Sequence, residues 1–108
     1  MKILVTGCAG FIGYHLVKSL IKKKNIKIYG VDNMNSYYSI KLKKLRLSEL
    51  KKNKSFKFYK FNISDFKKLE SLFSKIKFDI VVNLAAQAGV RYSLVNPKSY
   101  ISFYDSFI

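Results

Sequence analysis

The chain has 108 residues, which is enough for one small domain and excludes two. Hydrophobic residues make up 49% of it and aromatic residues 16%, so the composition excludes an intrinsically disordered protein. The formal net charge of +15 arises from 21 Lys and Arg residues against 6 Asp and Glu, which on its own favours an anionic partner such as a nucleic acid.

This positive charge is carried almost wholly by lysine, because Arg46 and Arg91 are the only arginines. Base recognition and bidentate phosphate binding favour arginine over lysine. Lys, Asn, Ile, Phe, Tyr and Ser are all abundant, as A/T-biased codons would produce. We therefore interpret the lysines as a solvated surface, and nucleic acid is the weaker of the partner hypotheses.

Cysteine content and hydropathy indicate a cytoplasmic protein. Cys8 is the only cysteine, so no internal disulfide can form, which fits a reducing compartment. Residues 5–8 resemble a lipoprotein cleavage site, but a signal peptide needs an apolar stretch of roughly 7–15 residues before such a site. No run reaches the ~20 apolar residues of a membrane span, since Asn83 and Gln87 interrupt the run that begins at Ile80. We expect no membrane partner.

The first elements predicted are a strand, a tight turn and a helix. Residues 2–6 form an apolar run that ends at Gly7. Apolar residues then recur at helical spacing as far as a lysine-rich stop; they are Ile12, Leu16 and Leu20. Residues 27–31 predict a second strand that ends at Asp32, and a polar loop follows over residues 33–39.

A basic helix is predicted over residues 40–52, and a third strand over residues 56–61, where Phe and Lys alternate. Asn62 or Ser64 is expected to cap the helix that follows. The apolar residues of that helix recur at steps of three and four; they are Phe66, Leu69, Phe73 and Ile76.

A fourth strand is predicted over residues 79–84, apolar enough to be buried on both faces, and Pro97 indicates the first turn of a last helix. Strands and helices that alternate in this way, with right-handed crossovers, predict an α/β fold with a doubly wound parallel sheet. We expect an incomplete sheet of about four strands in the order 3-2-1-4, with the fourth strand as an exposed edge.

The segment GCAGFIG at residues 7–13 lies between the first strand and the first helix, where a dinucleotide-binding turn belongs. Gly7 permits the tight turn, Gly10 lets the backbone approach a pyrophosphate, and Gly13 allows close packing of helix on strand. The helix N-terminus adds free N–H groups and a positive dipole for the phosphates. A glycine-rich turn without a ligand is the structural alternative.

Asp32 ends the second strand about 20 residues beyond this turn, where a carboxylate accepts hydrogen bonds from the adenosine ribose hydroxyls. A carboxylate at that place repels a 2′-phosphate, so NAD is favoured over NADP as the cofactor. An ordinary aspartate at a strand end is the alternative.

The spacing G-x-x-G-x-x-G resembles that of the extended short-chain dehydrogenase/reductase family, whose cofactor domain is of the Rossmann type. Three further segments are similar to the UDP-glucuronate 4-epimerases, a group of NAD-dependent nucleotide-sugar epimerases: DNMNSYY at 32–38, LKKLRL at 42–47 and NLAAQAGVRYS at 83–93. The similarity covers residues 1 to about 101. It implies that residues 1–108 form a single partial NAD-binding domain without the substrate domain.

The resemblance also implies which residues contact NAD and a UDP-sugar substrate. For the cofactor they are Gly7, Gly10, Phe11, Ile12, Gly13, Asp32, Asn33, Asn62, Ile63, Leu84, Ala85 and Ala86. For the sugar nucleotide they are Gln87, Arg91, Tyr92 and Ser93, with Arg91 near the anionic groups of the substrate. Asn62 departs from the family, which usually has Asp there, so its amide oxygen would accept from the adenine amino group with less electrostatic help.

The chemistry that the resemblance implies is oxidation of the sugar C4 hydroxyl by hydride transfer to NAD, followed by return of the hydride to the other face. It needs a tyrosine base whose pKa is lowered by a lysine four residues later, and the family has this pair beyond residue 108. Two Tyr-x-x-x-Lys strings occur, at residues 14–18 and 37–41, about as often as chance predicts. We assign no catalytic residue.

The chain leaves the family pattern at Ser102, for which a frameshift or premature stop is the preferred explanation. We therefore expect the NAD-binding portion of an epimerase, inactive alone. A non-catalytic NAD-binding or adenosine-binding module is the alternative function, and a basic nucleic-acid-binding protein is the weakest one. Cys8 and His15 have no neighbours in sequence that would complete a metal site.

Overall fold

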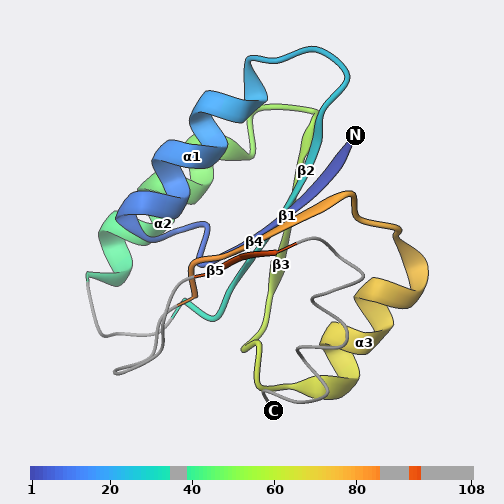
Figure 1. The fold of residues 1–108 in the computed structure, drawn as a ribbon. Coiled ribbons are helices and arrows are strands. Elements are labelled where there is room, and N and C mark those ends of the chain that lie inside the picture. The colour runs from blue at the N-terminus through green and yellow to red at the C-terminus, as the bar shows by residue number, and fades with distance from the viewer. Residues whose placement is uncertain (35–38, 86–92, 96–108) are drawn as a thin grey trace.

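The computed structural model describes residues 1–34, 39–85 and 93–95, and strands and helices alternate along the described chain as far as residue 83 (Figure 1). The elements are β1 (Lys2–Thr6), α1 (Phe11–Ile21), β2 (Lys27–Asp32), α2 (Ile40–Leu50), β3 (Phe56–Lys60), α3 (Phe66–Lys75), β4 (Ile80–Asn83) and β5 (Ser93–Val95). No helix in these ranges has the length and apolar character needed to cross a membrane.

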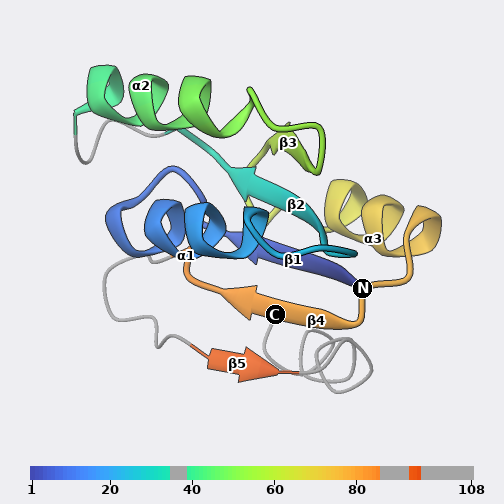
Figure 2. The ribbon, with the colours of Figure 1, turned by 90° about the horizontal axis from the view of Figure 1, so that it is seen from above.

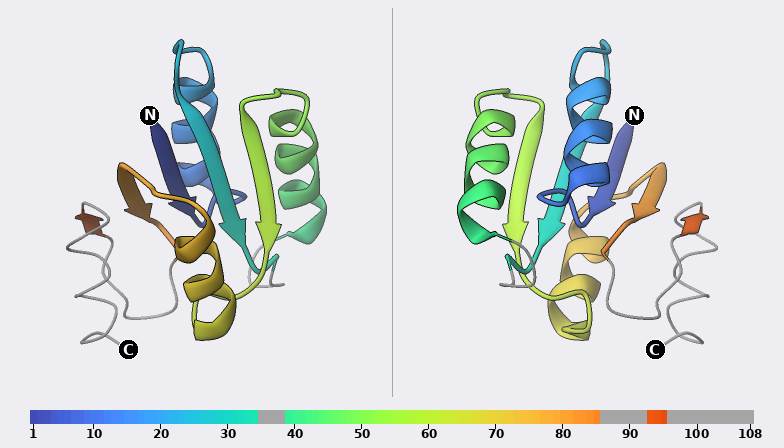
Figure 3. Two further views of the ribbon diagram at one scale, coloured as in Figure 1. Left: turned by 90° about the vertical axis from the view of Figure 1, so that its right-hand side faces the viewer. Right: turned by 90° about the vertical axis from the view of Figure 1, so that its left-hand side faces the viewer.

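The strands form one sheet in the order β3-β2-β1-β4-β5 (Figure 2). β1 pairs in parallel with β2 and with β4, and β2 pairs in parallel with β3. The four parallel strands therefore end at the same edge of the sheet (Figure 3). The predicted α/β class and the order 3-2-1-4 of the parallel strands are confirmed.

Helices cover both faces of the sheet, with α1 and α2 on one side and α3 on the other (Figure 1). Side chains of β1 alternate between the two resulting cores, because successive residues of a strand point to opposite faces. Ile3 and Val5 pack in the core beneath α1 and α2, whereas Leu4 packs in the core beneath α3. Such burial on both faces is what a parallel sheet between helices requires.

The prediction that the fourth strand forms an exposed sheet edge is wrong. The three residues of β5 pair with β4 in the antiparallel direction, with Ser93 opposite Asn83 and Val95 opposite Val81. The expected burial of this strand on both faces is also incomplete, since Val81 is fully buried while Ile80 and Val82 are half-buried. β4 lies nearer the edge of the sheet than β1, so the helices cover it less completely.

The cap of α3 also differs from the expectation. Asp65 caps this helix, and its Oδ1 accepts from Lys68 N at 3.3 Å. Asn62 instead forms a turn before the helix, where its Oδ1 accepts from the backbone N of Ser64 at 3.0 Å and from its hydroxyl at 2.9 Å. Asp65 directly precedes the first helical residue, which is the position from which a side chain reaches the free N–H groups.

The buried face of α3 is shifted from the one expected. Leu69 and Leu72 are its buried residues, whereas Phe66 is 42% exposed. Phe73 and Ile76 pack at the margin of the same core. Two leucines three residues apart lie on one side of a helix, so both reach the sheet.

Candidate functional site

The candidate site lies where β1, β2 and β4 end together, at the same edge of the sheet (Figure 3). Ligands of open α/β sheets bind outside the carboxyl ends of the strands, where the chain leaves the sheet in opposite directions. In this chain β1 leads into α1 on one face, and β3 leads into α3 on the other. The loops after these strands carry the residues that the sequence singled out.

The turn after β1 depends on two of its glycines. Gly7 has a φ of 73°, and a Cβ on it would lie 2.7 Å from the backbone of Leu84. A Cβ on Gly13 would lie 2.1 Å from the carbonyl oxygen of Gly7, so this helix residue packs directly on the turn. The tight turn expected at Gly7 is confirmed, whereas the close packing expected of Gly13 is made with the turn after β1 and not with the strand itself.

Gly10 is the N-cap residue of α1, and its surroundings differ from those of the other two glycines. Its φ of −73° and ψ of 172° suit any residue, and a Cβ there would meet only the carbonyl oxygen of Gly7, at 3.3 Å. Among the described residues no side chain caps the helix, and its first turn contains no acidic residue, so the first turn itself places no negative charge at the positive end of the helix dipole. Phe11 and Ile12 follow with 57% and 59% of their surface exposed. This end of α1 suits an anion approached through backbone groups.

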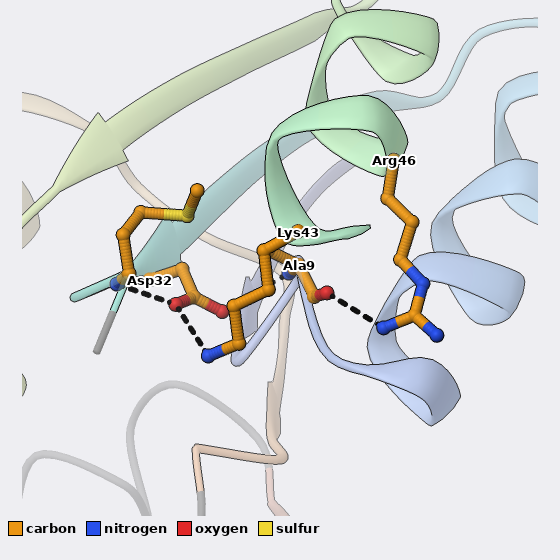
Figure 4. A network of polar contacts seen from close by, with 5 residues as sticks. Ala9, Asp32, Lys43 and Arg46 are labelled. Carbon is orange, nitrogen blue, oxygen red and sulfur yellow. Dashed lines mark hydrogen bonds and ion pairs between the residues drawn. The ribbon is translucent and has the colours of Figure 1, made fainter. Parts of the chain in front are cut away.

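Asp32 is a buried carboxylate, 5% exposed, at the end of β2 (Figure 4). Its Oδ2 accepts from Ala9 N at 3.0 Å, which ties the glycine turn to β2. Its Oδ1 accepts from Met34 N at 2.8 Å and lies 3.5 Å from Nζ of Lys43. Met34 has a φ of 56°, and the bond to Asp32 holds this left-handed residue in place.

Two basic residues of α2 reach the same region, and sequence reasoning did not single them out. Lys43 forms the buried ion pair with Asp32, with side-chain exposures of 8% and 4%. Arg46, one helical turn later, donates from Nη1 to the carbonyl oxygen of Ala9 at 3.2 Å (Figure 4). Its guanidinium also lies 5.9 Å from the ring centroid of Phe11. The peptide groups on both sides of Ala9 are therefore held, one by Asp32 and the other by Arg46.

Thr6 joins the ends of β1 and β4. Its hydroxyl donates to Oδ1 of Asn83 and accepts from the backbone N of Leu84 at 3.0 Å and of Ala85 at 3.1 Å. These bonds place Leu84 and Ala85 beside the glycine turn, as their contact with the Cβ position of Gly7 shows. Two of the three residues expected along this strand end are thus brought to the turn.

The remaining predicted residues lie apart from the turn or outside the described residues. Asn62 and Ile63 follow β3; Asn62 uses its amide oxygen within its own turn, and Ile63 packs at the margin of the core under α3. Asn33 is half-buried next to Asp32, and Ser93 begins β5. Outside the described residues lie Ala86, Gln87, Arg91 and Tyr92.

Comparison with known proteins assigns the chain to a protein family. Residues 4–104 match the family described as GDP-mannose 4,6 dehydratase. The chain belongs to this family. Protein CapI of Staphylococcus aureus is 52% identical over 101 residues, and the UDP-glucuronate 4-epimerase of Thermodesulfobacterium geofontis is 47% identical over 98 residues. These alignments cover 94% and 91% of this chain but 30% of each relative, so the chain spans about 30% of the length of the curated proteins it matches.

Solved structures of this dehydratase and epimerase group share the fold. The UDP-glucuronic acid 4-epimerase of Bacillus cereus, in complex with UDP-glucuronic acid and NAD, superposes with a TM-score of 0.73 at 38% identity, over 84% of this chain and 28% of that one. The dTDP-glucose 4,6-dehydratase of Bacillus anthracis, in complex with NAD, gives a TM-score of 0.70 at 27% identity, over 100% of this chain and 30% of that one. The resemblance to nucleotide-sugar epimerases and the Rossmann-type fold are confirmed.

One Tyr-x-x-x-Lys string of this family member, Tyr14 to Lys18, lies wholly among the described residues. The hydroxyl of Tyr14 donates to Glu49, and this hydrogen bond raises the pKa of Tyr14. Lys18 lies 3.3 Å from Oε1 of Glu49. A tyrosine base needs its pKa lowered toward neutrality, so this environment opposes a catalytic role for Tyr14. In the other string, Tyr37 lies outside the described residues.

The surroundings of Cys8 and His15 indicate structural roles for both side chains. Burial raises the pKa of the Cys8 thiol, and the negative charge of Asp32 raises it further. The thiol is fully buried and stays protonated, so it is not an available nucleophile. His15 packs its ring against Phe11 and Tyr14. Among the residues that the structure describes, no three His, Cys, Asp or Glu side chains form a group that would hold a metal ion.

Proposed function

We propose that this chain is the NAD-binding portion of a nucleotide-sugar 4-epimerase of the UDP-glucuronate type. One observation carries the proposal: the Asp32 carboxylate accepts a hydrogen bond from Ala9 N, so the acid at the end of β2 lies directly against the glycine turn that follows β1. The relatives named for UDP-glucuronate 4-epimerase activity, and the related structures in complex with NAD, support it.

The described residues fit such a cofactor. The uncapped end of α1 faces solvent without an acidic residue in its first turn, so it suits the pyrophosphate. A carboxylate has about four acceptor positions, and within the described residues Asp32 accepts from Ala9, Met34 and Lys43. We expect a ribose hydroxyl to donate to a further position of this carboxylate. Adenine contact at Asn62 requires that Ser64 release one of its two hydrogen bonds to the amide oxygen.

NAD would supply the hydride acceptor for the sugar C4 position, as the resemblance implies. The residues of this chain would bind and orient it: the turn would hold the pyrophosphate, Asp32 with Asn33 would hold the ribose, and Leu84 with Ala85 would contact the cofactor at the end of β4. We further propose that the chain alone does not catalyse epimerisation, because the hydrogen bond of Tyr14 to Glu49 disfavours its ionised form.

Calorimetric titration of the 108-residue chain with NAD tests the proposal. Gly10→Val should abolish binding, because the valine side chain occupies the space through which the pyrophosphate approaches the backbone. The φ and ψ of Gly10 suit valine, but a Cβ there lies 3.3 Å from the carbonyl oxygen of Gly7, so this backbone group must shift slightly in the variant. Circular dichroism checks that the variant keeps its fold.

Ser71→Val is the matched control, since it places the same side chain on the exposed surface of α3. This control should bind NAD as the wild type does. Undiminished NAD affinity in a folded Gly10→Val variant would show that the glycine turn is not the site.

A further inference from the structure

The glycine turn after β1 is held from a distant part of the chain, by Arg46 of α2. Nη1 of Arg46 donates to the carbonyl oxygen of Ala9 at 3.2 Å, across 37 positions of the sequence (Figure 4). On the other side of the same peptide bond, the N–H of Gly10 donates to the carbonyl oxygen of Gly7 at 3.1 Å. The peptide group between Ala9 and Gly10 is therefore held through both its oxygen and its nitrogen.

This peptide group directly precedes the backbone N–H groups that begin α1. The N–H groups in the first turn of a helix have no partner within the helix, and such groups bind phosphates. Glycine populates a wide range of φ and ψ, so Gly10 does not fix the path of the chain into the helix by itself. Contacts from outside the turn are needed to keep it in one conformation.

We propose that Arg46 is a positioning residue that keeps the glycine turn in the conformation which receives the pyrophosphate. This inference rests on the proposed NAD-binding function. A contact that orders a loop before the ligand arrives removes the cost of ordering from the free energy of binding. In this role Arg46 acts through the backbone of Ala9 and need not touch the ligand.

The guanidinium of Arg46 is itself held by aromatic rings. It lies 5.9 Å from the ring centroid of Phe11 and 6.0 Å from that of Tyr14. The hydroxyl of Tyr14 donates to Glu49, so this ring is in turn tied to α2. A planar, weakly hydrated guanidinium stacks well on aromatic faces, whereas the ammonium of a lysine is compact and strongly hydrated. The position therefore suits arginine better than lysine.

The competing interpretation is that Arg46 only joins α2 to α1 and so contributes to stability alone. In that case its removal should weaken every ligand of the folded chain equally, or none of them. A positioning role predicts a different result, because only ligands that carry phosphate groups use the turn. Adenosine lacks these groups, whereas ADP carries the diphosphate that represents the pyrophosphate of NAD.

The test is to measure the dissociation constants of ADP and adenosine by NMR titration of backbone amide signals. Arg46→Met should weaken ADP binding by about tenfold and leave adenosine binding within about twofold, since it removes a hydrogen bond from a charged group that orders the turn. Lys44→Met is the matched control, because it removes the same charge from an exposed residue of α2. This control should leave the ratio of the two constants unchanged.

Arg46→Lys keeps the proposal testable if Arg46→Met does not fold. It retains the charge and a donor but loses the planar group that stacks on the two rings. ADP binding should weaken by a smaller factor, about threefold, again with adenosine binding unchanged. The dispersion of the amide signals shows in the same experiment whether each variant is folded.

Three results would overturn the inference: equal weakening of ADP and adenosine in Arg46→Met, the same ratio in Arg46→Met and Lys44→Met, or a wild-type ratio in Arg46→Lys. In each case the wild-type chain would still bind NAD and ADP, so the proposed function would stand. A wild-type chain that binds neither NAD nor ADP would instead contradict the proposed function, and this inference with it.

Discussion

The carboxylate of Asp32 joins three segments of the chain that are distant in sequence. It accepts from Ala9 N in the glycine turn, from Met34 N in the loop after β2, and from Lys43 in α2. A buried carboxylate is stable only when it is paired and hydrogen-bonded, and these contacts meet that need. Asp32 is therefore a structural centre of the site as well as the candidate ribose contact.

The stability of the chain should depend on this buried pair in a non-additive way. Asp32→Ala removes the carboxylate that pairs with Lys43, and breaking a buried ion pair typically costs about 3–5 kcal/mol. Asp32→Ala combined with Lys43→Met should recover part of this loss, because neither charge of the pair is then buried. Urea unfolding monitored by circular dichroism gives the two free energies of unfolding. A double variant less stable than Asp32→Ala would contradict the expectation.

Side chains of α1 and α2 meet through Tyr14, Lys18 and Glu49, and this contact orients α2 over the glycine turn. Glu49 accepts from the Tyr14 hydroxyl and pairs with Lys18 at 3.3 Å. The hydrogen bond from Tyr14 lowers the pKa of Glu49, and the bond to Lys18 lowers it further. Lys43 and Arg46 of α2 contact Asp32 and Ala9 at the candidate site. The packing of α2 on α1 therefore affects the position of residues at the proposed binding site.

The contribution of Glu49 to stability should depend on pH with a defined sign. A carboxyl group whose pKa is lowered by folding stabilises the protein fully above its ordinary pKa of about 4.3, and this contribution is lost as the pH falls through the lowered value. The difference in unfolding free energy between wild type and Glu49→Gln should therefore be present at pH 7 and vanish in acid. Urea titrations at several pH values measure it. A difference that grows in acid would exclude this role.

Local patterns in the sequence predict the helices and strands of this fold well. They do not predict which side chains of different elements contact one another. A strand and a turn could be predicted from residues 2–6 and from the glycines at 7 and 13, because an apolar run and a glycine spacing are patterns within a short stretch of sequence. Lys43 and Arg46 touch partners 11 and 37 residues away, and many lysines share their local pattern. Only the packing of α2 beside α1 selects these two.

At the scale of the whole molecule, the arrangement of the sheet brings the residues of the candidate site together. Parallel strands bring the ends of β1, β2 and β4 to one edge, and Thr6 fixes the end of β4 beside the turn. The alternation of strands and helices predicts a doubly wound parallel sheet, and the order 3-2-1-4 is the one of its two common strand orders that dinucleotide-binding sheets have. The antiparallel pairing of β5 could not be predicted from the sequence, because a strand of three residues is too short to show a recognisable alternation of apolar and polar side chains.

The chain alone should show no epimerase activity on UDP-glucuronate in the presence of NAD. The pKa of Tyr14 is raised by its hydrogen bond to Glu49, which is the wrong direction for a base at neutral pH. Chromatographic separation of UDP-glucuronate from its C4 epimer measures the conversion. Turnover that disappears in Tyr14→Phe or in Tyr37→Phe would contradict this expectation.

The most direct test of the central claim compares NAD, AMP and nicotinamide mononucleotide as ligands of the same chain by calorimetry. The described residues include the glycine turn and Asp32, which we propose as the adenosine half of a dinucleotide site. We therefore predict that NAD and AMP bind with dissociation constants within a few-fold of each other, and that nicotinamide mononucleotide binds far more weakly. Binding of nicotinamide mononucleotide as tight as that of NAD, with no binding of AMP, would contradict the account.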